Sequence, residues 1–137
     1  FFFKQKTAYE ISTRDWSSDV CSSDLGATWD LIVNTDPDIY FKIDSAGTNL
    51  YSGTNSYFTD ITASSLPMSW PALPSPQIIR NLSANYSVTL YDSDSPISSD
   101  DLMGTISFIM NDHKSGYPSS FQITNGTSTV TINGTWY

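Results

Sequence analysis

Short runs of apolar residues alternate with polar ones along most of the chain, and clusters of Gly, Asn, Asp, Ser and Pro separate these runs. In Ser87–Tyr91, for example, Val88 and Leu90 alternate with Ser and Thr, so the segment would bury one face of a strand. We expect no helix. The pattern predicts an all-β fold, an antiparallel β-sandwich of about eight strands. The expected strands are Trp29–Val33, Ile39–Ile43, Asn49–Ser52, Gln77–Arg80, Ser87–Tyr91, Gly104–Met110, Ser120–Thr124 and Thr127–Ile132.

Two Asn-Gly dipeptides are the strongest local turn signals. Gly and Asn tolerate the positive φ angles of tight hairpin turns. Asn125-Gly126 is therefore expected to join the last two strands, and Asn133-Gly134 is a second candidate turn. Few residues follow that second turn, so we expect the chain to finish in a short edge strand or a truncated one.

Residues 1–25 resemble translated sequencing-adapter sequence. Lys4–Ile11 and Asp15–Leu25 back-translate in one reading frame to two adapter parts, and Ser12–Arg14 falls where a variable barcode would lie. We therefore expect residues 1–25 to be non-native and residues 26–137 to form one domain. Because the sequence begins without Met, we expect the native N-terminus, together with any signal peptide, to lie outside it.

Charge and cysteine content narrow the range of partners. Residues 26–137 contain three basic residues and ten acidic residues, all of them Asp, so the net charge is 3 − 10 = −7. Nucleic acid is not an expected partner, because contacts with phosphates require Lys and Arg. Cys21 is the only cysteine and lies within residues 1–25, so the expected domain forms neither disulfides nor thiolate metal sites.

Two groups of Asp residues lie beside strand-like runs. One is in Y-D-S-D-S-P-I-S-S-D-D-L-M-G, at Tyr91–Gly104, and the other is in W-D-L-I-V-N-T-D-P-D-I, at Trp29–Ile39. Ca²⁺ prefers about six to eight oxygen ligands. If a sandwich brings these two loops together, their carboxylates and backbone carbonyls offer such a set. Zinc, copper or iron would call for His or Cys, and His113 is the only histidine. The alternative is that these Asp residues only initiate turns.

The acidic loops resemble those of the C2 domain, a calcium- and lipid-binding β-sandwich. The third calcium loop of that family runs D-x-D, a spacer, and then D followed by two apolar residues and Gly, which Asp92, Asp94 and Asp101-Leu-Met-Gly match. The first calcium loop has one Asp and then D-P-Y before a strand, which D-P-D-I-Y-F-K-I resembles. The resemblance implies Ca²⁺ ligands at Asp30, Asp38, Asp92, Asp94 and Asp101.

Two spacings depart from the family pattern. The spacer before Asp101 and the gap between Asp30 and Asp38 are both longer than is common in the family. Asp36 is therefore an alternative to Asp30, and whether Asp100 also binds the metal is open.

We expect the chain to be a noncatalytic calcium-binding module of a larger protein that is extracellular or on the cell surface. No catalytic activity is expected, because His113 has only its chain neighbour Asp112 beside it and no nucleophile motif such as G-x-S-x-G occurs. Besides calcium, the resemblance implies anionic phospholipid as a partner, with Pro96-Ile97 as a candidate inserting tip. Three basic residues, however, form no polybasic lipid patch.

Two other partner classes are open. Carbohydrate could stack on a platform of Trp29, Trp70 and Trp136, although aromatic residues in a small sandwich are more often part of its core. Another protein is the third candidate partner. A protein partner leaves no distinctive residue pattern, so the sequence does not decide between these classes.

Overall fold

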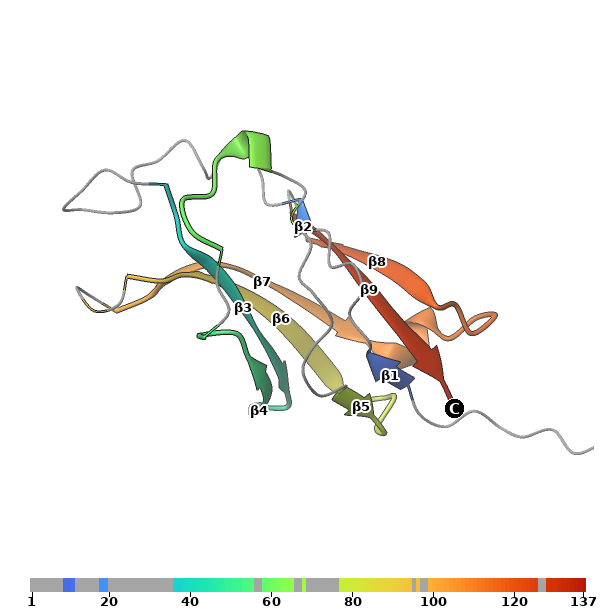
Figure 1. Ribbon diagram of the computed structural model, residues 1–137. Helices are drawn as coiled ribbons and strands as arrows, with labels where there is room; N and C mark the ends of the chain where they lie inside the picture. The colour runs from blue at the N-terminus through green and yellow to red at the C-terminus, as the bar shows by residue number, and fades with distance from the viewer. Residues whose placement is uncertain are drawn as a thin grey trace, which may run out of the picture.

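The structure is a computed structural model of the 137-residue chain, and it describes residues 9–11, 18–19, 36–55, 58–65, 68, 77–94, 96, 99–125 and 128–137. These residues form nine β-strands and two 3₁₀ turns, η1 (Ala63–Ser65) and η2 (Met110–His113), and no α-helix. Neither turn has the length or the apolar character needed to cross a membrane. The strands lie in two antiparallel sheets (Figure 1).

The first sheet has the order β4-β3-β6-β7. Its strands are β3 (Ile39–Ser45), β4 (Thr48–Ser52), β6 (Asn85–Asp92) and β7 (Asp101–Ile109). Ala46 and Gly47, with φ angles of 48° and 82°, make the tight turn between β3 and β4. Positive φ at both central residues gives a turn whose twist matches that of the strands it joins.

The second sheet contains β1 (Tyr9–Ile11), β2 (Ser18–Asp19), β5 (Gln77–Ile79), β8 (Ser120–Asn125) and β9 (Ser128–Trp136). β9 pairs with β8 and, at different positions along its length, with β2 and β1. β1 also pairs with β5. β1 and β2 both lie within residues 1–25, whose assignment to adapter sequence stays a prediction.

One hydrophobic core lies between the two sheets. On β3, Ile39, Phe41 and Ile43 are buried in this core and alternate with residues on the outer face. Val130 and Ile132 of β9 contribute to the same core from the second sheet. Alternation along each strand thus places one face of each sheet inside the sandwich.

The structure confirms the all-β fold class and the antiparallel sandwich. Each expected strand that falls in the described part of the chain overlaps an observed strand. Asn125 and Ser128 pair at the ends of β8 and β9, which confirms the hairpin expected there. The expected strand at Trp29–Val33 lies outside the described residues.

The prediction of a turn at Asn133-Gly134 is wrong, because both residues lie inside β9. Asn133 pairs with Ser120 of β8. Gly134 is buried, and its N–H donates to the carbonyl of Ser119 (2.9 Å). Pairing with the neighbouring strand therefore overrides the local preference of Asn-Gly for a turn.

Candidate metal-binding site

The start of β3 and the loop between β6 and β7 lie at the same end of the first sheet (Figure 1). In the antiparallel register, Ile39 of β3 pairs with Asp92 of β6, and Asp92 in turn pairs with Asp101 of β7. Asp38 precedes β3 directly. The topology therefore places Asp38, Asp92 and Asp101 at one end of the sheet, although they are far apart in the sequence.

Asp92 ends β6 with its side chain on the core face. It continues the buried series of Tyr86, Val88 and Leu90, and only 1% of its surface is exposed. Burying a carboxylate is costly unless hydrogen bonds or a cation compensate its charge. One such bond comes from the backbone N–H of Asp38, which donates to Oδ1 of Asp92 (2.7 Å).

Asp38 connects three segments at this end of the sandwich. Its carbonyl accepts a hydrogen bond from the N–H of Ser93 (2.8 Å), directly after β6. Its Oδ1 accepts a second bond from the N–H of Asp60 (2.9 Å). Asp60 has a φ of 50°, a left-handed conformation that Asp tolerates better than most residues. Hydrogen bonds therefore join the two acidic loops directly, and residues 58–61 are hydrogen-bonded to the first of these loops and to the start of β3.

The side chain of Asp100 is held by a residue on the outer face of the first sheet, opposite the core. The hydroxyl of Tyr40, on β3, donates to Oδ2 of Asp100 (2.5 Å). Tyr40 is fully buried, and its ring stacks on Tyr91 of β6, with ring centres 5.3 Å apart and planes 13° apart. Burial first, and then the hydrogen bond with Asp100, raise the pKa of Tyr40 above its ordinary value. The phenol is therefore protonated at neutral pH and acts as the donor.

Lys42 lies on the same outer face as Tyr40. Its Nζ is 4.4 Å from the centre of the Tyr91 ring and 5.6 Å from that of Tyr40, within the range of cation–π attraction. The outer face of β3 and β6 thus carries two stacked tyrosines and a lysine next to the acidic loops.

The remaining predicted ligands differ in burial. Asp94 is partly buried in the loop after β6, and Asp101 and Asp36 are exposed. Asp30 lies outside the described residues. Across the ranges that the structure describes, no three His, Cys, Asp or Glu side chains are arranged to hold a metal ion. A hydrogen bond joins Asp38 to Asp92, but the described residues alone assemble no complete ligand set.

Two contacts at this end were missed by sequence reasoning. Nothing in the sequence marks Asp60 as a neighbour of Asp38, because their contact depends on how residues 58–61 pack beside β3. The sequence pattern predicts only that Tyr40 lies in a strand, and not that it contacts Asp100. Its place between two apolar residues of a strand that follows an acidic loop is a signal that an outer-face aromatic lies near that loop.

His113 is a packing residue in η2. Its ring stacks on Phe121 with centres 4.3 Å apart and lies edge-on to Phe108 at 6.4 Å. The ring therefore packs between strand residues and is only partly exposed.

Trp136 is also part of the core. It is 5% exposed, and its Nε1–H donates to the carbonyl of Pro118 (2.9 Å). A buried ring offers no open face on which a sugar could stack. Trp29 and Trp70, the other candidates for a carbohydrate platform, lie outside the described residues.

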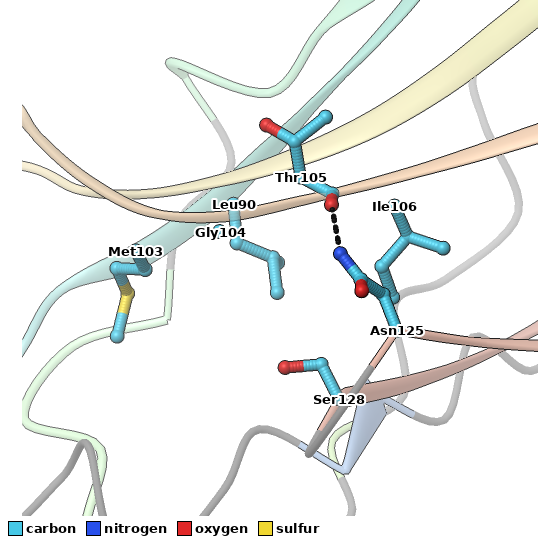
Figure 2. A pocket seen from close by; sticks show the side chains of 7 residues that line it. All are labelled: Leu90, Met103, Gly104, Thr105, Ile106, Asn125 and Ser128. Carbon is cyan, nitrogen blue, oxygen red and sulfur yellow. Dashed lines mark hydrogen bonds between the residues drawn. The ribbon is translucent and has the colours of Figure 1, made fainter.

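A small hollow of about 180 Å³ lies between β6 and β7 of the first sheet and the β8–β9 hairpin of the second (Figure 2). Its lining consists of Leu90, Met103, Gly104, Thr105, Ile106, Asn125 and Ser128. Gly104 pairs with the core residue Leu90, and a Cβ added at Gly104 would meet no atom within 4 Å. The hollow is thus the space that a side chain at position 104 would fill, and no charged residue lines it.

Comparison of the sequence with models of known protein families and with curated proteins finds no match. Solved structures of human GIVD cytosolic phospholipase A2 are similar in fold. One gives a TM-score of 0.60 and 14% identity over 96% of this chain and 16% of that chain. Its complex with methyl gamma-linolenyl fluorophosphonate gives a TM-score of 0.59 and 12% identity over 96% of this chain and 17% of that chain.

A third structure, of the complex with that inhibitor and terbium chloride, gives a TM-score of 0.53 and 12% identity over 96% of this chain and 18% of that chain. At these identities the similarity shows a shared fold alone. The chain spans about a sixth of the length of the phospholipases that it matches.

Proposed function

We propose that residues 26–137 form a noncatalytic, C2-like module that binds Ca²⁺ between its two acidic loops. The observation that carries this proposal is the direct bond between those loops, in which the N–H of Asp38 donates to the buried carboxylate of Asp92, 54 residues away (2.7 Å). A turn-forming Asp has no need of a partner from a distant loop or of burial at 1% exposure.

The side chains at this end suit a hard cation. Asp38, Asp92, Asp94 and Asp101 offer carboxylate oxygens, and Asp30 would add another from the segment before β3. Ca²⁺ takes such oxygen ligands in flexible geometries. When bound, it would compensate the negative charge of these carboxylates, of which that of Asp92 is buried.

Binding to the native state alone would stabilise the fold. We expect CaCl₂ to raise the melting temperature of the chain more than equal MgCl₂ does, because Mg²⁺ keeps several of its waters. The chain carrying both Asp92→Asn and Asp94→Asn should lose this calcium response. Asp112→Asn is the matched control, since it removes an exposed charge from η2, outside the acidic loops. An equal response in the double variant and the wild type would refute the site.

Weak affinity would be sufficient in an extracellular setting. Extracellular calcium modules bind in the range of about 10⁻⁴–10⁻³ M. This is the setting that we propose for the larger protein, which would be secreted or displayed at the cell surface.

A calcium-dependent contact with anionic phospholipid is the second candidate function. Leu102, at the start of β7, is 61% exposed, and Pro96 in the preceding loop is exposed as well. Ile97, the other residue of the predicted inserting tip, lies outside the described residues. The similar fold occurs in a phospholipase, a protein that acts on phospholipids. Calcium-dependent sedimentation with phosphatidylserine vesicles, lost in Leu102→Ser, would support this function. Sedimentation that is unchanged by Leu102→Ser would count against it.

A further inference from the structure

The Tyr40–Asp100 hydrogen bond links β3 to the residue before β7 on the outer face of the first sheet. Tyr40 lies on β3, and Asp100 lies 60 residues later, directly before β7. The donor is well fixed, because Tyr40 is fully buried and stacks on Tyr91 of β6. Lys42 caps the Tyr91 ring from the same face. The hydroxyl of Tyr40 is therefore a rigid anchor for the end of the β6–β7 loop.

The position of this anchor separates Asp100 from the candidate ligands. Tyr40 alternates with Ile39 and Phe41, whose side chains point into the core, so its own side chain lies on the outer face. Asp92 lies on the core face, in series with Val88 and Leu90. The Asp100 carboxylate, bonded to Tyr40, is thus drawn toward the face opposite the carboxylate of Asp92. In this arrangement Asp100 is poorly placed to share a cation with Asp92.

We propose that Asp100 is a positioning residue, and that its bond to Tyr40 fixes the first residue of β7, Asp101, at the cation site. This inference rests on the proposed calcium function and assigns a role that the sequence left open. An anchor that already holds Asp100 lowers the conformational entropy that Asp100 and Asp101 lose when the metal binds. The bond therefore increases calcium affinity although neither partner contacts the cation.

Tyr40→Phe tests the role without changing charge, because it removes only the hydroxyl and keeps the ring that stacks on Tyr91. We expect this variant of the full chain to bind Ca²⁺ about three- to tenfold more weakly in a two-dimensional NMR titration with CaCl₂. If Asp100 is instead a ligand, Tyr40→Phe releases its carboxylate, and affinity stays the same or increases. Either of these results would overturn the positioning role.

Two substitutions at Asp100 provide a matched comparison. Asp100→Asn and Asp100→Ala remove the same charge, but only Asn keeps an oxygen that accepts the Tyr40 hydroxyl. Asp100→Asn should therefore bind Ca²⁺ about three- to tenfold more tightly than Asp100→Ala. In the Tyr40→Phe background this difference should vanish, because no hydroxyl remains to donate. A difference of the same size in both backgrounds would refute the tether.

Metal-free unfolding distinguishes failure of this inference from failure of the calcium function. The destabilisations caused by Tyr40→Phe and Asp100→Ala in urea should be strongly non-additive, because either one breaks the same bond. Additive effects together with normal calcium binding would overturn the tether alone. If the wild-type chain binds no Ca²⁺, the calcium function fails and the positioning role fails with it, even where the non-additivity shows that the bond exists.

Discussion

Asp92 and Asp101 show how differently one residue type is used at paired positions. They face each other across β6 and β7, yet Asp92 is 1% exposed and accepts a bond from Asp38, whereas Asp101 is exposed. The sequence marked both as ligands by a motif. It did not mark the difference in burial, because the burial of Asp92 depends on the core face of β6 and on a loop 54 residues away.

This difference predicts unequal costs of substitution. Asp92→Ala leaves the N–H of Asp38 without its acceptor, so we expect the metal-free free energy of unfolding to fall by about 1–3 kcal/mol. Asp101→Ala, at an exposed position, should change it by no more than about 0.5 kcal/mol. Urea unfolding followed by circular dichroism measures both values. Equal effects of the two substitutions would show that the buried bond contributes nothing to stability.

At the scale of strands, alternation of apolar and polar residues predicted most of the fold. β3, β6 and β7 follow that rule, because each buries one face against a single core. The rule fails where contacts across the sheet decide. Asn133-Gly134 looks like a turn locally, but Asn133 pairs with Ser120 and continues β9. The Tyr40–Asp100 bond was likewise beyond prediction, because it joins residues 60 positions apart through the register of β3 and β6 and the path of a loop.

Two glycines in extended segments have opposite surroundings and provide a test at this scale. A Cβ at Gly104 would meet no atom within 4 Å, whereas one at Gly53 would lie 3.0 Å from the backbone oxygen of Phe41. Gly104→Ala should stabilise the fold by about 0.5–1 kcal/mol, because Gly weakens a strand relative to Ala. Gly53→Ala should destabilise it by about 1 kcal/mol, since backbone cannot easily yield.

Thermal unfolding of the two Gly→Ala variants compares the signs directly. A loss of stability in Gly104→Ala would mean that the hollow beside Leu90 is not open space.

For the whole molecule, the origin of residues 1–25 and the candidate site are separate questions. The first sheet, which carries Asp92, Asp101 and the Tyr40 anchor, is built entirely from residues 39–109. Residues 1–25 contribute strands only to the second sheet. The residues of the candidate site are therefore the same whether or not residues 1–25 are native.

Calcium binding between the two acidic loops is tested most directly by titrating the full chain with CaCl₂ and recording the chemical shifts of its backbone amides. The amides of Asp38, Asp60 and Ser93 donate hydrogen bonds within the candidate site. If Ca²⁺ binds there, the chemical shifts of these amides change on addition of CaCl₂ and return when a chelator removes the metal, while those of η2 stay constant. Absence of shifts at a saturating, millimolar-range concentration, or shifts that centre on another part of the molecule, would contradict it.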